Sequence, residues 1–333
     1  MIDFALSRAT TAAEASQQAA TTKTAQQGAQ VRYIAGGTTL VDLMKLDVET
    51  PERVIDINRL ELSKVERQPD GSLRIGALVR NSDLAQDPNV QRDYPVLSQA
   101  LLAGASAQLR NMATTGGNLL QRTRCPYFRE LAYAECNKRT PGSGCAAMDG
   151  HNRTHAILGT SDHCIATHPS DMAVAMTALE ARIHILGTGG ERDVPVGDFY
   201  LLPGTTPHLE NVLKPGDLIT YVTLPAAQAG SKSHYLKLRD RASYEFALAS
   251  AAVVVQSEGG HIRRARVALG GVGTRPWRSP EAEHALTGKP ANEATFRTAA
   301  DAALRSARPQ HDNGFKVELA KRCLVRALTT VTA

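Results

Sequence analysis

The pattern of apolar and polar positions over the first 60 residues predicts short strands separated by short helices. The second of these helices has apolar side chains at Leu40, Leu43 and Met44, which lie on one face at helical spacing. The pattern therefore predicts a small β-α-β-α-β unit, and we expect it to form an N-terminal subdomain over residues 1–60. The strands are expected at 4–6, 31–35 and 53–57, and the helices at 11–27 and 38–46.

Beyond residue 60 the pattern changes twice. Two apolar runs flank Asp70-Gly71, which is a hairpin signal. After a polar boundary near 225–230, strand-type runs are followed by two helical patterns. This order predicts a C-terminal antiparallel sheet backed by helices over residues 228–333. Strands are expected at 62–68, 72–78, 182–186, 235–238, 247–256 and 262–269, and helices at 82–86, 96–102, 171–179, 293–305 and 313–328.

One stretch, at about 121–168, shows neither the helical spacing nor the strand alternation of apolar residues. It is rich in glycine, proline, asparagine and charge, as in RTPGSG at 139–144. Such a composition is typical of loops. We interpret it as an excursion from a second subdomain that spans residues 61–227.

The composition excludes several classes of protein. The chain has 333 residues, 42% hydrophobic and 21% charged, which suits a folded protein of more than one subdomain. No run approaches the roughly 18 apolar residues of a membrane span. The net charge of +5 comes without a basic block that would indicate nucleic-acid binding. The chain begins without a signal-peptide pattern, so taken alone it is expected in the cytoplasm.

The cysteines are unevenly placed, since four of the five fall within residues 125–164. A disulfide framework is typical of small secreted domains, which this chain is not. A zinc site usually shows closely spaced cysteine pairs, and no CxxC occurs. An iron–sulfur cluster on four thiolates is favoured by Cys125-Pro126, and a zinc site and unrelated thiols remain as alternatives. Cys323 lies in an amphipathic helical pattern and is expected in the core.

Two glycine pairs are candidates for phosphate contact. Gly36-Gly37 lies at a predicted strand-to-helix junction, and Gly116-Gly117 lies in a second predicted loop with threonine neighbours. Glycine lets backbone amides approach an anion, although each pair could also be a turn that needs positive φ. Neither GxGxxG nor GxxxxGK[ST] occurs, which argues against a Rossmann NAD domain and a P-loop.

Seven motifs, in order along nearly the whole chain, resemble the FAD-binding subunits of the molybdenum hydroxylase (xanthine dehydrogenase/aldehyde oxidase) family. The nearest resemblance is to the branch of bacterial periplasmic aldehyde oxidoreductases. The motifs are IAGGT at 34–38 with Met44-Lys45, LRN at 109–111, ATTGGN at 113–118, Ser170-Asp171, LKPGDLI at 213–219, YLKLR at 235–239 and VALGGV at 267–272.

The resemblance implies an α+β protein with a vanillyl-alcohol-oxidase-type FAD fold: two α/β subdomains and the C-terminal sheet with helices. It also implies sites. Asp171 would bind a polar part of FAD, and Lys237 would lie beside the flavin ring. The alternatives are that Asp171 only caps a helix and that Lys237 is a surface lysine. The first loop would cradle the pyrophosphate, with Leu40 near the isoalloxazine. The implied FAD contacts are Ala35, Gly36, Gly37, Thr38, Thr39, Leu40, Thr114, Gly116, Gly117, Asn118, Asp171, Ile219 and Lys237.

The excursion at 121–168 distinguishes this chain from most of that family. Two branches, the aldehyde oxidoreductases and 4-hydroxybenzoyl-CoA reductase, carry a [4Fe-4S] cluster on such an insertion. The resemblance therefore implies four cluster ligands, with His163 and His168 as alternatives that are expected to be solvated loop residues. The proposed ligands are Cys125, Cys136, Cys145 and Cys164.

The implied function is electron transfer within a complex. A large subunit would hold the molybdenum cofactor, a small subunit would hold [2Fe-2S] clusters, and electrons would pass through FAD in this chain to an external acceptor. Export of the folded complex on a partner's signal would make it periplasmic. The alternatives are a 4-hydroxybenzoyl-CoA-reductase-like subunit, a zinc-stapled interaction module without a redox role, and a stand-alone FAD reductase of the cell-wall-precursor type.

Overall fold

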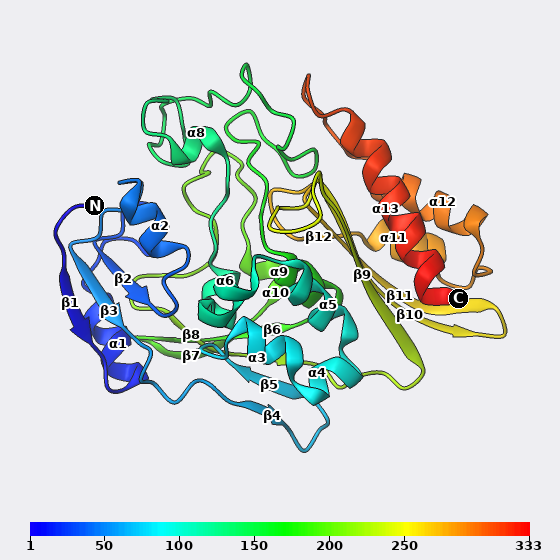
Figure 1. The fold of residues 1–333 in the computed structure, drawn as a ribbon, viewed down its shortest axis with the longest axis horizontal. Helices are drawn as coiled ribbons and strands as arrows, with labels where there is room; N and C mark the ends of the chain where they lie inside the picture. Colours follow the sequence, from blue (N-terminus) through cyan, green and yellow to red (C-terminus); the bar gives the residue numbers. More distant parts are fainter.

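A three-stranded parallel sheet forms the N-terminal part of the computed structural model, which describes residues 1–333 (Figure 1). Its strands are β1 (Ala5–Arg8), β3 (Arg53–Asp56) and β2 (Val31–Ile34), in that spatial order. The helices α1 (Ala12–Ala19) and α2 (Leu40–Lys45) connect them. The predicted β-α-β-α-β unit is therefore confirmed.

Helix α1 is shorter than the predicted helix at 11–27, so that prediction is wrong at its C-terminal end. After Ala20 the backbone is irregular, because polar side chains bond to the main chain in place of helical partners. The Thr22 hydroxyl accepts from the Gln30 amide at 3.1 Å, and the Gln26 side chain donates to the Leu213 carbonyl at 3.1 Å. Threonine and other short polar residues commonly compete with helices in this way.

A five-stranded antiparallel sheet forms the second layer. Its middle strand, β8 (Leu218–Leu224), pairs with β5 (Leu73–Gly76) on one side and β6 (Arg182–Gly187) on the other. Its edge strands are β4 (Val65–Arg67) and β7 (Gly190–Pro195). The predicted hairpin around Asp70-Gly71 is confirmed as β4–β5, whereas the sequence reading missed β8. Beside this sheet lie α3 (Asn81–Gln86), α4 (Pro88–Asp93), α5 (Pro95–Ala103), α6 (Ala107–Met112), α7 (Thr115–Leu119) and α10 (Val196–Phe199).

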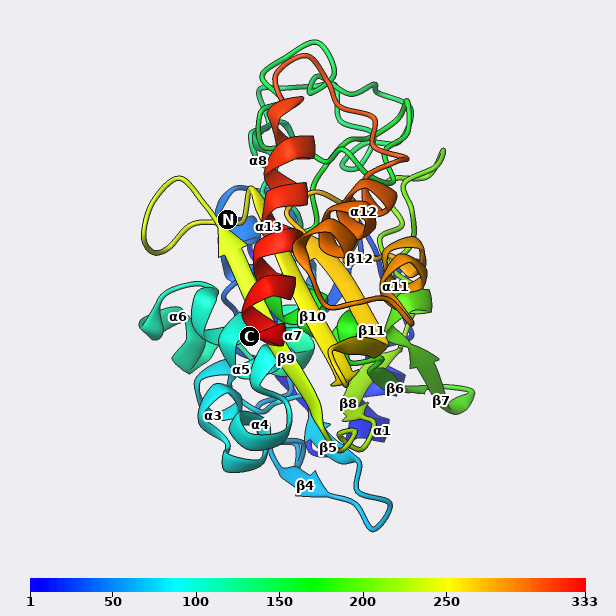
Figure 2. The ribbon, with the colours of Figure 1, turned by 90° about the vertical axis from the view of Figure 1, so that its right-hand side faces the viewer.

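The C-terminal sheet is antiparallel and has helices on both faces. Its central strand β10 (Ala249–Glu258) is buried on both sides over most of its length, because α13 (Phe315–Thr332) covers one face and α5 and α9 cover the other. Figure 2 shows α13 lying across this sheet. The remaining elements are β9 (Ser231–Leu238), β11 (His261–Gly270), β12 (Trp277–Arg278), α11 (Pro280–Leu286) and α12 (Glu293–Ala303).

Helix α9 (Asp171–Ala178) lies at the centre of the molecule. All eight of its residues are buried, as expected for a helix that is apolar all round. Ser170 caps it, since the hydroxyl accepts from the Ala173 amide at 2.9 Å. One core of 31 buried residues joins α9 and α5 to the five-stranded sheet and to one face of the C-terminal sheet. The first residue of α9, Asp171, is thereby fixed at the point where the layers meet.

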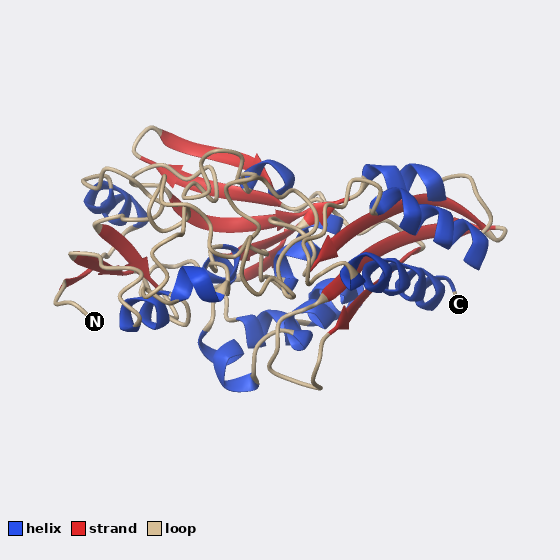
Figure 3. Cartoon of the chain, turned by 90° about the horizontal axis from the view of Figure 1, so that it is seen from above, coloured by secondary structure: helices blue, strands red, loops and turns tan.

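The stretch at 121–168 contains only one helix, α8 (Pro126–Arg129), and is otherwise a looped excursion, as predicted. Figure 1 shows it above the sheets, between α2 and the beginning of α13, and Figure 3 shows loops concentrated in the centre of the molecule. Arg124 and Arg129 pair with Asp42 of α2 at 2.8 and 2.7 Å. The excursion therefore bridges the N-terminal subdomain and the C-terminal helix. No helix of the molecule is long and apolar enough to span a membrane.

Candidate functional site

The loop between β2 and α2 presents unused hydrogen-bond donors. The backbone amides of residues 36–39 have no acceptor in the chain, and the Thr38 and Thr39 hydroxyls have no partner either. Gly37 has φ +72°, a conformation that suits glycine. At Gly36 the loop packs so closely that a Cβ would lie 1.8 Å from the Met112 carbonyl oxygen. This set of amides and hydroxyls is suited to an anionic ligand such as a pyrophosphate.

The second glycine pair forms a helix and not the predicted loop. Gly116 and Gly117 lie in α7, and the hydroxyl of the N-cap Thr114 accepts from the Gly117 amide at 3.2 Å. The Gly116 amide donates to the Ala77 carbonyl at 2.8 Å. Both glycine amides are thus used within the chain. The free donor here is the Asn118 Nδ2, because its Oδ1 already accepts from Ser170 at 2.7 Å.

These two segments form facing walls of one cleft with two chambers. The chambers hold about 1180 and 1640 Å³ including their open mouths. Thr38, Thr39, Ala113, Gly117 and Arg122 line both chambers, which therefore communicate. The structure brings together every residue that the resemblance implied. The first chamber holds Ala35, Gly36, Gly37, Thr38, Thr39, Leu40, Thr114, Gly116, Gly117 and Ile219, and the second holds Asn118, Asp171 and Lys237.

Asp171 and Lys237 form a buried ion pair in the second chamber. Lys237 Nζ lies 2.8 Å from Asp171 Oδ2, and the two side chains are 4% and 8% exposed. Tyr235 donates from its hydroxyl to Asp171 Oδ1 at 2.5 Å, and burial together with the Asp171 charge raises the pKa of Tyr235 well above its usual value. Lys237 is thus not a surface lysine, and Ser170 is the residue that caps α9. The pair therefore fixes the position of the Lys237 ammonium beside the second chamber.

Charged side chains also connect the first chamber to the excursion. The buried Arg122 pairs with Glu49 and with Glu210, both at 2.5 Å, and Lys138 pairs with Glu210 at 2.9 Å. Although burial opposes ionisation, these two cations lower the pKa of Glu210 to about 2. The sequence reading missed this network, whose members lie far apart in the chain and form no motif.

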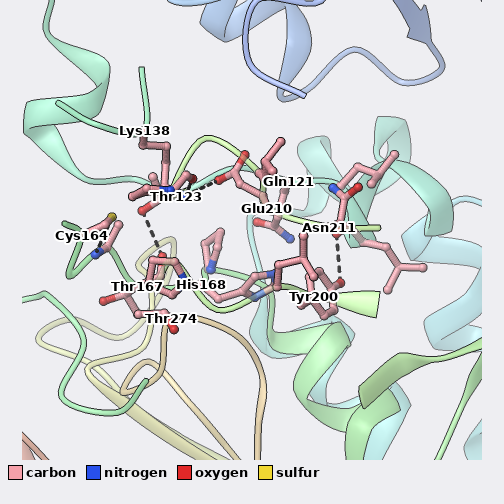
Figure 4. Close-up of a pocket in the computed structure, with 18 residues that line it drawn as sticks. Gln121, Thr123, Lys138, Cys164, Thr167, His168, Tyr200, Glu210, Asn211 and Thr274 are labelled. Atoms are coloured by element: carbon pink, nitrogen blue, oxygen red, sulfur yellow. Dashed lines mark hydrogen bonds and ion pairs between the residues drawn. The ribbon is translucent and has the colours of Figure 1, made fainter. Parts of the chain in front are cut away.

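Figure 4 shows the cavity where this network reaches the cysteine segment. Lys138 points toward Glu210 on one side, and the Thr123 hydroxyl donates to the Thr167 carbonyl at 3.0 Å on another. Cys164 lines the same cavity. His168 packs edge-on against Tyr200, with ring centroids 4.6 Å apart, and burial lowers its pKa to about 3. His168 is therefore a packed, neutral residue and not a solvated one, whereas His163 is exposed as predicted.

The four clustered cysteines converge within the excursion as free thiols. Cys136 and Cys145 pair across an isolated bridge, and Cys125 packs in one small core with Cys136 and in another with Cys145. Burial, with Cys164 and Cys136 nearby, raises the pKa of Cys125 to about 12 and that of Cys145 to about 11. Neutral thiols of this kind become thiolates only when cations neutralise them.

No three His, Cys, Asp or Glu side chains are close enough together in this structure to hold one metal ion. What the four thiols could hold is therefore judged from their donor chemistry. Four thiolates are the donor set of iron–sulfur clusters and also of structural zinc sites, so Cys125, Cys136, Cys145 and Cys164 fit either group.

His155 is a further residue that the sequence reading missed. Its Nε2 lies 3.2 Å from Cys125 Sγ, and its side chain is buried beside Tyr127. Burial lowers the pKa of His155 to about 4, so the imidazole is neutral at ordinary pH. The two partners are 30 positions apart in the chain, so no local spacing could have indicated the contact. By contrast Cys323, on α13, is buried in the core between the C-terminal sheet and its helices, as predicted.

The fold and cleft are those of a family of flavoprotein subunits. The family described as the FAD binding domain in molybdopterin dehydrogenase matches residues 3–227, and the CO dehydrogenase flavoprotein C-terminal domain matches residues 234–331. The chain therefore belongs to the FAD-binding subunits of molybdenum hydroxylases and is a subunit of an oxidoreductase. The predicted family and fold class are confirmed.

Similar proteins include one at high identity. The chain is 52% identical to the aldehyde oxidoreductase FAD-binding subunit PaoB of Escherichia coli K12, over 99% of this chain and 98% of the relative. It is 28% identical to the carbon monoxide dehydrogenase medium chain of Hydrogenophaga pseudoflava, over 92% and 91%. The solved carbon monoxide dehydrogenase of that organism matches with a TM-score of 0.77 at 27% identity, over 99% of this chain and 98% of that chain.

Proposed function

We propose that this chain is the FAD- and [4Fe-4S]-containing electron-transfer subunit of a molybdenum-dependent aldehyde oxidoreductase. The observation that carries the proposal is the pairing of a two-chambered cleft with four converging thiols in one chain. The 52% identity to an aldehyde oxidoreductase subunit supports the substrate class. Aldehyde oxidation would take place on a large molybdenum subunit, with a small [2Fe-2S] subunit between it and this chain.

In the cleft, the chain's own groups provide for an anionic dinucleotide. The free amides of residues 36–39 and the Thr38 and Thr39 hydroxyls would hold the pyrophosphate, and the Asn118 Nδ2 would donate from the opposite wall. Asp171 holds Lys237 in place, so that the ammonium is available to a developing negative charge in the second chamber. When bound, FAD would accept an electron pair and pass the electrons on.

In the excursion, the chain's thiols would hold the cluster. Cys125, Cys136, Cys145 and Cys164 would each bind iron as a thiolate. Burial raises the pKa of Cys125, Cys145 and Cys164, so these three would give up a proton on binding. One cavity lies between this region and the flavin cleft, and its walls include both Cys125 and Asp171. The cluster would supply one-electron transfer toward an external acceptor.

Cofactor analysis of the purified complex tests the proposal. We expect stoichiometric FAD, four irons with four sulfides per chain beyond those of the [2Fe-2S] subunit, and an additional EPR signal on reduction. Cys125→Ser should abolish that signal and retain FAD, while Cys323→Ser, which changes a buried thiol outside the excursion, should change neither. One zinc in place of the iron would overturn the cluster and favour the zinc-stapled module.

A further inference from the structure

A buried histidine contacts one of the four converging thiols. His155 is 2% exposed, and its Nε2 lies 3.2 Å from Cys125 Sγ. The other ring nitrogen, Nδ1, is buried and has no hydrogen-bond partner. The imidazole therefore makes a single side-chain hydrogen bond, and that bond is directed at Cys125.

The direction of this hydrogen bond follows from the chemistry of the sulfur. A thiolate that ligates iron has no hydrogen to give and can only accept. The imidazole nitrogen that faces it must then carry the proton, so Nε2–H donates to sulfur and Nδ1 remains an unprotonated acceptor.

The backbone around His155 is held from two sides. The buried Lys316 Nζ donates to the carbonyls of His155 at 2.9 Å and of Gly271 at 2.6 Å. The side chain of Asn313 donates to the Asn152 and His155 carbonyls at 3.2 and 3.3 Å. The Ala156 amide donates to the Ile165 carbonyl at 2.9 Å, next to Cys164. The imidazole is therefore held in place by C-terminal residues as well as by the cysteine segment.

Cys125 is also the thiol that faces the flavin side. It lines a cavity that Asp171 also lines, and this cavity shares Arg124, Pro169, Asp171, Glu245 and Phe246 with the second chamber of the cleft. Cys136, Cys145 and Cys164 do not line it. A change in electron density at Cys125 would therefore act on the side of the cluster that exchanges electrons with the flavin.

We propose that His155 donates its Nε2–H to the Cys125 thiolate and raises the reduction potential of the cluster. The inference rests on the proposed function, because it requires a cluster. Hydrogen bonds to ligand sulfur withdraw negative charge and favour the reduced, more negative state. His155 is thus a positioning residue that tunes the potential without ligating the metal.

The test is an EPR-monitored redox titration of the intact complex. His155→Phe removes the donor and keeps a planar side chain, whereas His155→Gln keeps an N–H donor. We expect both variants to retain the iron content of the wild type, with a lower midpoint potential in His155→Phe and an intermediate one in His155→Gln. The Fe–S stretching bands in resonance Raman spectra should shift in the same order. His163→Phe is the matched control, since His163 is exposed next to Cys164 and should leave the potential unchanged.

The possible failures are distinguishable. If the wild type lacks the additional iron, the proposed function fails. If the iron is present and the potentials of all variants equal that of the wild type, the tuning role is wrong. Loss of iron from both His155 variants would also overturn the inference, because His155 would then be a ligand or a structural residue.

Discussion

At the scale of single residues, the cleft depends on charges that are buried and paired. Asp171 and Lys237 are the clearest case. Both side chains are buried away from water, and each is the other's partner of opposite charge. Breaking such a pair by removing one partner commonly costs about 3–5 kcal/mol, because the remaining charge is left uncompensated. The pair therefore contributes to folding as well as to the electrostatics of the second chamber.

Lys237→Met should lower the free energy of unfolding by about 3 kcal/mol, because Asp171 would keep only the Tyr235 hydroxyl. Urea denaturation measures the change. Lys232→Met is the matched control, since Lys232 lies on the same strand but is exposed. Adding Asp171→Asn to Lys237→Met should recover part of the loss. Equal effects of the two lysine substitutions would contradict the buried pair.

Glu210 should make the protein sensitive to acid in a defined window. Its pKa is lowered from 4.5 to about 2 in the folded state, so between these values the unfolded chain binds more protons. The stabilisation, on the order of 3 kcal/mol, is present above pH 4.5 and is lost as the pH falls through about 2. Urea unfolding at several pH values should show the difference between wild type and Glu210→Gln shrinking in that window. Glu258→Gln, in an exposed pair, should show no such trend.

At the scale of elements, the sequence predicted most of the parts and misjudged those that depend on distant contacts. Alternating apolar residues were sufficient for β6, where alternate positions are buried, and strand-type runs of apolar residues were sufficient for β2 and β11. The strand β8 was missed. Its partners β5 and β6 lie far from it in the sequence, so only the folded structure shows the pairing. Helix α7 was predicted as a loop because it contains two glycines. It forms a helix because the capping Thr114 and the close packing of Gly116 on Ala77 outweigh them.

Gly36→Ala should separate the two walls of the cleft. The new Cβ would meet the Met112 carbonyl at 1.8 Å, so one wall must move. We expect a loss of about 1–3 kcal/mol in stability and reduced flavin content, read as the absorbance ratio of flavin to protein. Gly197→Ala is the control, because nothing lies within 4 Å of the added Cβ and φ is not positive. Full flavin content in Gly36→Ala would show that the wall is more compliant than its packing indicates.

At the scale of the whole molecule, the excursion has much less core than the sheets that it bridges. The two main cores contain 31 and 24 buried residues, whereas the two that include cysteines 125, 136 and 145 contain 4 and 3. So small a core rarely stabilises a segment without a metal or a disulfide. The family resemblance carried the prediction of the site here, because no local pattern brings four distant cysteines together.

Removing iron with a chelator should therefore loosen the excursion selectively. Limited trypsin digestion should then cut near Arg124, Arg129 and Arg139, while the sheets remain intact by circular dichroism. Mass spectrometry of the fragments locates the cuts. Untreated complex is the control. Cleavage that spreads at the same rate through the C-terminal sheet, or an excursion that stays resistant without iron, would contradict this view.

The clamp made by Asn313 and Lys316 has a consequence for the order of biosynthesis. Both residues bind the turn at Asn152 and His155, more than 150 positions earlier in the chain. During translation the cysteine segment leaves the ribosome long before the residues that fix its neighbouring turn. The turn beside the cysteines can therefore be fixed only after the last helix has been made, so this part of the molecule is completed late and after translation.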